Sequence, residues 1–303
     1  MIESGPTRFR HYVAIDWSGA AGDRHRGIAV AMCANGKAAP ELVRSGHRWS
    51  RSEVAQWLLD DLPDNSLVGL DLGMSLPFAD CGAFFPGWEE TPADARSLWV
   101  LVEQVCADDP HLGANSLVDH THAARHYRRH GGRQGDLFGG MDPADGIKTD
   151  GRGRFRQTEL AQQAMGCRPY SNFNLVGAAQ VGKSSLTGMR LLHRVSQRLT
   201  VWPVDPVGET GSVITEIYTT IAAMAAGRPP GRSKMRSLAE LNQALETLGS
   251  APIPGEDHLI DDHQTDALLT AAWLRMSADR PELWNPHGMS AVAQTEGWTF
   301  GAT

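Results

Sequence analysis

Cysteine is scarce in this chain, and its four cysteines lie far from one another. None of them belongs to a Cys-x-x-Cys pair, which excludes a zinc knuckle and gives no basis for a disulfide framework. No apolar run approaches the roughly 20 residues that a membrane-spanning helix needs. The segment Met1 to Arg10 lacks the hydrophobic core of a signal peptide. We therefore expect reduced thiols, no membrane partner and a cytoplasmic location.

Internal repeats and a clear interdomain linker are also missing. The length of 303 residues allows one large domain or two small ones, and the composition is ordinary for a globular protein. We predict a single domain over residues 10–280, with an irregular insertion at about 80–170 and a C-terminal tail over 281–303. The Gly- and Arg-rich stretch 131–156 within the insertion is typical of a surface loop.

Basic residues are outnumbered by acidic ones, and a net charge of −7 argues weakly against a nucleic acid partner. Their distribution is uneven, however, because eight Arg or Lys accompany only four Asp between His120 and Gln157. Such a local patch can hold a phosphate backbone by charge without base readout, although a solvated polar loop has the same composition. The predicted nucleic-acid-binding residues are Arg125, Arg128, Arg129, Arg133, Arg152, Arg154 and Arg156.

The hydrophobic pattern predicts an α/β fold with a mixed sheet flanked by helices. Strands are expected near 11–16, 27–33, 40–48, 66–71, 199–204 and 212–218. Helices are expected near 50–60, 92–105, 158–166, 184–197, 219–226, 237–248 and 262–278. The first helix has Ser50 as its N-cap and Glu53 three residues on, which is a capping-box pattern. Three successive strands, then a helix and a strand, indicate a sheet with an antiparallel part.

Four of these elements carry acids in positions suited to metal chemistry. Three apolar runs end on Asp16, Asp71 and Glu216, and a helical stretch opens with Asp262, His263 and Asp266. Acids at strand ends and on one helix can converge at one rim of a sheet, although they lie far apart in sequence. Hard divalent cations need such a cluster of oxygen ligands. The candidate catalytic residues are Asp16, Asp71, Glu216 and Asp266, and the candidate metal ligands add Asp262 and His263.

Each acid also has a plainer interpretation, because an Asp at a strand end often only caps a loop. Glu216 is harder to dismiss, since a Glu among the apolar residues of a strand is costly unless it is paired, hydrogen-bonded or metal-bound. Asp266 shares a helix face with either Asp262 or His263. The joint occurrence of the acids, more than any one of them, indicates a metal site.

Several stretches of the chain resemble a known protein family. They are Ala14-Ile15-Asp16, Leu70 to Pro77, Thr215 to Tyr218, Thr265 to Ala272, Gly177 to Val195 and Val201-Trp202-Pro203. The family is widespread in bacteria and archaea, is catalogued as domain of unknown function 429, and is regarded as predicted ribonuclease H-like nucleases. The resemblance runs through most of the chain, although each motif is short. Where that family usually has Pro after Glu-x-Tyr, this chain has Thr219.

The resemblance implies a ribonuclease H-like fold related to the RuvC resolvases. Their acids lie on the first strand, a later strand and the C-terminal helix. By position, Asp16 matches the first of these, Asp71 or Glu216 the second, and Asp266 with His263 or Asp262 the helix pair. We therefore expect a nuclease that hydrolyses phosphodiester bonds with two Mg²⁺ or Mn²⁺ ions, which activate water and stabilise the departing oxygen.

Two other enzyme classes fit parts of the sequence. The segment Gly177 to Ser184 satisfies G-x-x-x-x-G-K-[ST], the phosphate-binding loop of a P-loop NTPase, although the preceding run 172–176 is short and half polar for a strand. In an actin-like ATPase or sugar kinase, 16–19 and 71–73 would be the phosphate loops. Such proteins generally duplicate the fold, for which this chain is short.

Two further alternatives are not P-loop or kinase enzymes. The chain can be a non-catalytic nucleic-acid-binding module that keeps the same fold and its acids. His122, His126 and His130 recur every four residues, so on one helix they can bind zinc or a similar metal, or simply face solvent.

Overall fold

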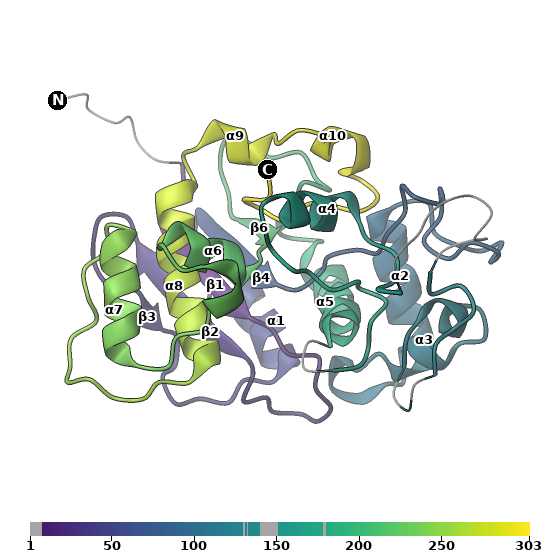
Figure 1. Cartoon of the computed structure of the whole chain (residues 1–303), viewed down its shortest axis with the longest axis horizontal. Helices are drawn as coiled ribbons and strands as arrows, with labels where there is room; N and C mark the ends of the chain where they lie inside the picture. The colour runs from purple at the N-terminus through teal and green to yellow at the C-terminus, as the bar shows by residue number, and fades with distance from the viewer. Residues whose placement is uncertain (1–7, 130, 132, 140–150, 178–179) are drawn as a thin grey trace.

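A mixed sheet of six strands forms the centre of the molecule in a computed structural model, which describes residues 8–129, 131, 133–139, 151–177 and 180–303 (Figure 1). The strands are β1 (His11–Asp16), β2 (Ala29–Ala34), β3 (Glu41–Leu42), β4 (Ser66–Asp71), β5 (Thr200–Trp202) and β6 (Val213–Glu216). Their order across the sheet is β3-β2-β1-β4-β6-β5. The predicted α/β class with a mixed sheet flanked by helices is confirmed.

The sheet has an antiparallel half and a parallel half. β1, β2 and β3 follow one another with antiparallel pairing, as short connections allow. β4 then pairs with β1 in parallel, and β6 pairs in parallel with both β4 and β5. Parallel neighbours require crossover connections, which contain helices between β1 and β4 and between β4 and β6, whereas residues 203–212 connect β5 to β6 without one. The third strand is shorter than the predicted run 40–48, because pairing with β2 extends only over Glu41 and Leu42.

Helices cover both faces of the sheet. One face packs against α1 (Arg51–Asp60), α2 (Ala95–Val105) and α5 (Val181–Val195), and the other against α6 (Thr219–Ala225), α7 (Leu238–Thr247) and α8 (Asp262–Ser277). Each face of the sheet has its own hydrophobic core, and successive side chains of β1 alternate between the two. Val13 and Ile15 face α5, whereas Tyr12 and Ala14 face α8. Figure 1 shows α8 lying across β1 and β2.

Local sequence signals explain where several helices begin. At the start of α1, the Ser50 hydroxyl accepts the Glu53 N–H at 3.1 Å and the Glu53 carboxylate accepts the Ser50 N–H at 2.8 Å, so the predicted capping box is present. Asp94 and Ser97 cap α2 in the same reciprocal way, so this helix begins after Asp94 and not near residue 92. Within the described residues, no helix has the length and hydropathy that crossing a bilayer requires.

The region between 80 and 170 is more ordered than the predicted irregular insertion. Its elements are α2, η1 (Pro110–Leu112), α3 (Asn115–Asp119), η2 (Ala123–His126) and α4 (Gln157–Ala164). Phe84, Phe85 and Trp99 from this region are buried in the same core as the sheet. Of the predicted surface loop 131–156, residues 132 and 140–150 lie outside the described residues.

The C-terminal segment, predicted as a tail, is instead packed into the body of the protein. It contains α9 (Pro281–Trp284) and α10 (Met289–Val292), and the chain end lies beside α4 (Figure 1). Trp298 and Phe300 are buried, and the Phe300 N–H donates to the carbonyl of Glu216 at the end of β6. The lack of a helical or strand-like period in this segment reflects its irregular backbone, not a lack of tertiary contacts.

Candidate metal centre

Two of the predicted acids end neighbouring parallel strands. Asp16 is the last residue of β1, Asp71 is the last residue of β4, and the two are paired in register. Adjacent strands lie about 4.8 Å apart, so the two carboxylates start from neighbouring backbone positions. Both acids follow the alternation of Tyr12 and Leu67, whose side chains belong to the core beneath α8. Asp16 and Asp71 therefore face α8.

Asp266 reaches the same place from α8. This helix begins after Asp261, whose carboxylate accepts the His263 N–H at 3.0 Å as an N-cap. Gly69 of β4 lets the helix approach, since a Cβ at that position would lie 3.0 Å from a methyl of Leu274. Asp16, Asp71 and Asp266 consequently line one cavity of about 370 Å³. The three acids thus share a cavity, but their carboxylates do not form a group whose oxygens all lie within 4.8 Å of one another.

The existing partners leave this acidic cluster only partly neutralised. The Nδ1 of His263 lies 2.7 Å from Oδ2 of Asp16. Lys234, which lies between α6 and α7, places its ammonium 3.1 Å from Asp266 and 3.0 Å from Asp262. Among the described residues, nothing donates a hydrogen bond to the Asp71 carboxylate or forms an ion pair with it. Asp71 is thus an uncompensated acid beside two others.

Titration behaviour follows from this crowding. Burial, followed by the charges of Asp16 and Asp266, raises the pKa of Asp71 well above its usual range. Burial also raises the pKa of Asp266, to about 6, against the opposing effect of Lys234. The hydrogen bond to Asp16 raises the pKa of His263 to about 9, so the imidazole is protonated at neutral pH. The cluster holds more negative charge than its own cations neutralise, and it needs protons or bound cations.

Glu216, the fourth predicted acid, has partners that Asp71 lacks. In β6 it is paired with Leu70, so alternation directs its side chain to the opposite face from Asp71. Its carboxylate accepts from Arg156 at 2.6 and 2.8 Å, from the Met74 N–H at 2.7 Å and from the Thr299 hydroxyl at 2.5 Å. Both carboxylate oxygens are engaged by these donors, although Glu216 lines the same cavity as Asp71, so its role as a metal ligand stays a prediction.

The predicted basic patch does not form a continuous surface for phosphate. Arg154 and Arg156 are buried: Arg154 holds Asp80 and Arg156 holds Glu159 and Glu216. Arg125 and Arg129 form ion pairs with Asp136 and Asp119. Arg128, Arg133 and Arg152 are exposed. Several arginines of the predicted patch thus form ion pairs within the protein and do not add free positive charge to the surface. Because Arg154 and Arg156 are buried, they cannot contact a phosphate backbone.

The histidine stripe is not a metal site in the part of the chain that the structure describes. His126 is buried between Phe85 and Phe173, and burial lowers its pKa to about 4. His122 stacks on Trp88, and His130 lies outside the described residues. Among the described residues, one group of three side chains has its potential metal-binding atoms all within 4.8 Å of one another. It consists of Asp261, Asp262 and His263, at the start of α8.

The P-loop pattern lacks its structural context. Residues 172–176 form no strand apart from one bridge between Asn174 and Arg128, and residues 178–179 lie outside the described residues. Gly182 is already in the first turn of α5, where a Cβ would lie 2.5 Å from the carbonyl oxygen of Asn172. The glycine is therefore explained by close packing of α5 on the preceding loop.

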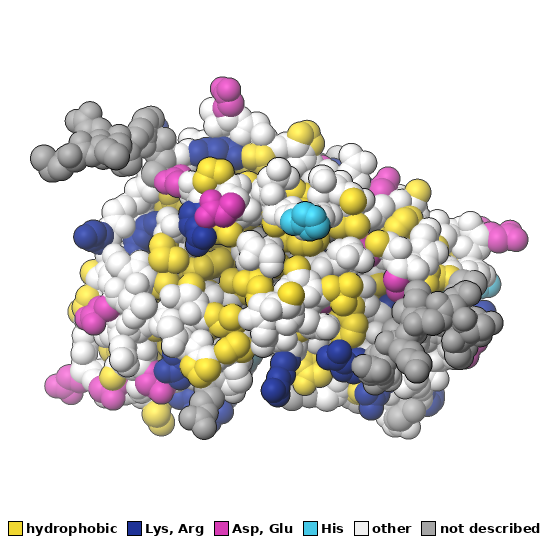
Figure 2. Space-filling model, turned by 45° about the horizontal axis from the view of Figure 1, so that its top comes forward, with side chains coloured by type: hydrophobic (Ala, Val, Ile, Leu, Met, Phe, Trp, Pro, Cys, Tyr) yellow, Lys and Arg dark blue, Asp and Glu magenta, His cyan; other side chains and the backbone are white. Residues whose placement is uncertain are grey.

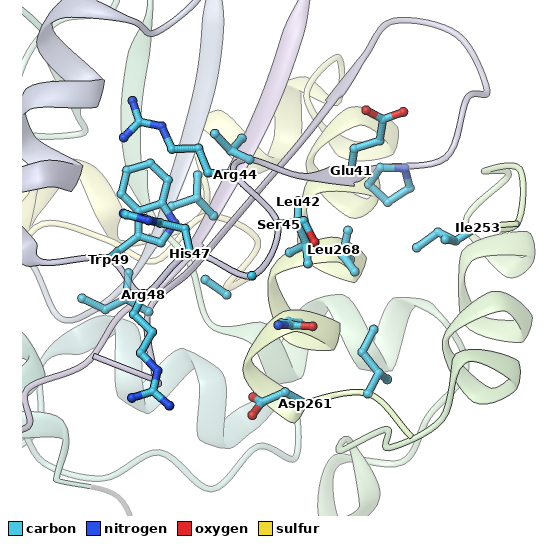
Figure 3. A pocket seen from close by; sticks show the side chains of 18 of the residues that line it. Glu41, Leu42, Arg44, Ser45, His47, Arg48, Trp49, Ile253, Asp261 and Leu268 are labelled. Carbon is cyan, nitrogen blue, oxygen red and sulfur yellow. The ribbon is translucent and has the colours of Figure 1, made fainter. Parts of the chain in front are cut away.

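Three residues of the cavity escaped the sequence argument. Lys234 and Tyr170 line it together with the acids but belong to no local pattern that marks a site; Tyr218 also lines it and belongs to the Glu-x-Tyr pattern, but it is not among the predicted site residues. A second cavity, of about 900 Å³, is lined by Asp261 and Gln264 of the same helix start. Figure 3 shows Leu42 and Leu268 at its centre, with basic and acidic side chains around them, and Asp16 and Asp71 do not line it.

Comparison of the chain with models of protein families, with curated proteins and with solved structures gives no match. The functional argument therefore depends on the residues and their geometry.

Proposed function

We propose that this protein is a metal-dependent nuclease of the ribonuclease H-like type, which hydrolyses phosphodiester bonds. The observation that carries the proposal is that Asp71, which has no hydrogen-bond or ion-pair partner among the described residues, lines one cavity with Asp16 and Asp266. Burying a carboxylate without a partner is costly, and such perturbed acids cluster at functional sites. A structural role would instead supply a donor for it, as it does for Glu216.

The topology supports the fold part of the proposal. An antiparallel β1-β2-β3 unit is followed by β4, which pairs in parallel with β1, and a late helix crosses β1. The acids lie on the first strand, on the next strand beside it and on that helix. This is the distribution that the sequence resemblance implies for ribonuclease H-like nucleases.

The donor set suits a hard divalent cation. Asp16, Asp71 and Asp266 would hold Mg²⁺ or Mn²⁺ through carboxylate oxygens, and Asp262 lies at the edge of the group beside Lys234. When bound, a pair of such ions supplies an activated water and stabilises the departing oxygen. His263 orients Asp16 through its 2.7 Å contact, and Lys234 neutralises Asp262 and Asp266 on the open side.

The test compares wild type with Asp16→Asn and Asp71→Asn. We expect Mg²⁺ or Mn²⁺ to raise the melting temperature of the wild type, because the ions bind the folded state. Each variant should lose that shift and at least about 100-fold of its cleavage of a labelled oligonucleotide. Asp64→Asn, which removes an exposed acid just before β4, is the matched control and should retain both.

One outcome distinguishes an enzyme from a binding module. Oligonucleotide binding without any metal-induced shift in the wild type would support the non-catalytic alternative and reject the proposal. In addition, Asp71→Asn should melt at a higher temperature than wild type in EDTA, since it removes an uncompensated charge. An unchanged melting temperature there would show that Asp71 is not under electrostatic strain.

The nucleotide-hydrolysing alternatives receive less support. The P-loop interpretation needs a strand before Gly177, and the described residues of 172–176 provide only the Asn174 bridge. An actin-like enzyme would need a second copy of the fold, whereas the described residues form the single six-stranded sheet.

A further inference from the structure

The predicted basic stretch, where the structure describes it, is poorly suited to the backbone of a nucleic acid duplex. A duplex binder places several Lys or Arg against successive phosphates. Here Arg154 and Arg156 are buried, and Arg125 and Arg129 are already paired with acids. On the face in Figure 2, the described basic side chains are dispersed among acidic and uncharged ones. Another kind of contact must hold the substrate at the acidic cavity.

An exposed tyrosine occupies the edge of that cavity. Tyr170 lies between α4 and α5 with 55% of its surface exposed, and it is the one aromatic side chain among the large hydrophobic residues exposed in the described part of the chain. It lines the same 370 Å³ space as Asp16 and Asp71. An aromatic ring left in water at the edge of a polar cavity has a free face for a ligand.

A second tyrosine links this edge to the acids. Tyr218, which caps α6, also lines the cavity and is half-buried. Tyr170, Tyr218 and Asp71 thus line the same cavity.

We propose that the cavity takes an unpaired nucleotide of a single strand, whose base stacks on Tyr170 while its phosphate lies over Asp16, Asp71 and Asp266. This inference rests on the proposed nuclease function and specifies its substrate class. A cavity of about 370 Å³ lies at the small end of the range for ligand sites, which suits one nucleotide. Stacking on aromatic rings is the usual way to hold single strands, and it tolerates any base.

The experiment measures binding by fluorescence anisotropy with Ca²⁺ in place of Mg²⁺, so that binding is read without cleavage. The probes are a fluorescein-labelled oligothymidylate, its duplex with oligoadenylate, and an abasic strand of the same length. We expect the wild type to bind the single strand at least about tenfold more tightly than the duplex. Tyr170→Leu should weaken single-strand binding by roughly tenfold, and Tyr170→Phe and Tyr170→Trp should restore it.

The abasic strand separates stacking from a general effect on the fold. It offers phosphates without bases, so wild type and Tyr170→Leu should bind it equally weakly. Met276→Ser removes another exposed apolar side chain, near the end of α8, and should bind all three probes like wild type. Melting temperatures of all variants should agree within the error of the measurement.

Three results would overturn the inference. They are equal wild-type affinity for duplex and single strand, a Tyr170→Leu variant that binds like Met276→Ser, and an equal loss on the abasic strand. Failure of the inference is distinguishable from failure of the nuclease proposal, because the Mg²⁺-induced melting shift and cleavage are measured separately. If both persist in Tyr170→Leu with unchanged single-strand affinity, the nuclease stands and stacking is rejected. If the wild type shows neither the melting shift nor cleavage, the nuclease proposal is rejected as well.

Discussion

At the level of single residues, two acids on adjacent strands differ in whether other side chains neutralise them. Asp71 and Glu216 both end apolar strands; Glu216 is buried and Asp71 is partly exposed to the cavity. Glu216 lies on the face where Arg156 and Thr299 donate to it, whereas Asp71 lies on the face of α8 and receives no donor from the described residues. One carboxylate therefore stabilises the fold, and the other is kept available at a cost in stability.

This cost should depend on pH through Asp266. Its folded pKa of about 6 exceeds the ordinary value of 3.8, so its contribution to stability is full below pH 3.8 and is lost as pH rises through about 6. The shift corresponds to on the order of 3 kcal/mol. In EDTA, the free energy of unfolding of the wild type should therefore fall relative to that of Asp266→Asn as the pH rises from 4 to 7. Urea unfolding at several pH values measures it.

Metal binding should respond in the opposite direction. A carboxylate ligand must be deprotonated, so the Mg²⁺-induced rise in melting temperature should grow over the same pH interval. Because the other groups that titrate there are common to both proteins, Asp266→Asn serves as the reference. A pH-independent difference between the two proteins would show that Asp266 has an ordinary pKa.

At the scale of elements, the site depends on how closely two turns approach α5. A Cβ at Gly19, after β1, would lie 2.4 Å from the Ser184 nitrogen, and one at Gly73, after β4, would lie 2.3 Å from the Asn172 side chain. The turns that follow Asp16 and Asp71 therefore press against the start of α5 and the loop before it. Gly182 and Ser184, from the predicted phosphate loop, take part in this packing.

This packing makes a prediction that separates a structural glycine from a phosphate loop. Gly182→Ala should lower the free energy of unfolding by about 1–3 kcal/mol, since its Cβ would meet the Asn172 carbonyl oxygen. Gly231→Ala is the control, because a Cβ there meets nothing within 4 Å. Equilibrium urea unfolding of both variants provides the comparison. Equal stabilities would mean that α5 can shift without loss.

Lys183→Ala tests the same segment for nucleotide binding. In a P-loop this lysine contacts the β and γ phosphates, so its loss abolishes ATP binding. We expect no saturable ATP binding by the wild type in isothermal titration calorimetry, and at most a modest loss of nuclease activity in the variant, more evident at low salt. Micromolar ATP affinity that disappears in Lys183→Ala would favour the NTPase alternative.

At the scale of the whole molecule, the C-terminal segment joins parts of the chain that are distant in sequence. The carboxylate of Glu296 accepts the N–H groups of Phe78 and Ala79, in the segment after β4, and of Gln157, at the start of α4. Thr299 donates to Glu216. Through these contacts the last residues of the chain hold the floor of the cavity in place.

Removing one of these contacts should destabilise the protein without removing a catalytic group. Thr299→Val keeps the shape but leaves one oxygen of Glu216 with one donor fewer, so we expect a loss of about 1–3 kcal/mol. Thr299→Ser keeps the hydroxyl and should lose less. Urea unfolding measures both variants. If Val and Ser variants prove equally stable, the hydroxyl contributes nothing and the segment is held by Trp298 and Phe300 alone.

The sequence by itself determined the local features of this protein. Apolar, β-prone runs give the limits of β1 and β4, and Ser50 with Glu53 gives the start of α1, because these signals depend on neighbouring residues. Acids at the ends of two such strands and at the start of a helix also predict a shared rim, since parallel strands end at the same edge.

Only the tertiary structure decided which polar groups are neutralised. Arg156 donates hydrogen bonds to Glu216, which is 60 positions further along the chain, and Thr299 donates to it from 83 positions away. No local pattern encodes such pairings, because they depend on strand register and on which helix covers which face. For the same reason, the sequence did not distinguish Asp71 from Glu216 as a ligand, and it did not reveal Tyr170 at the edge of the cavity.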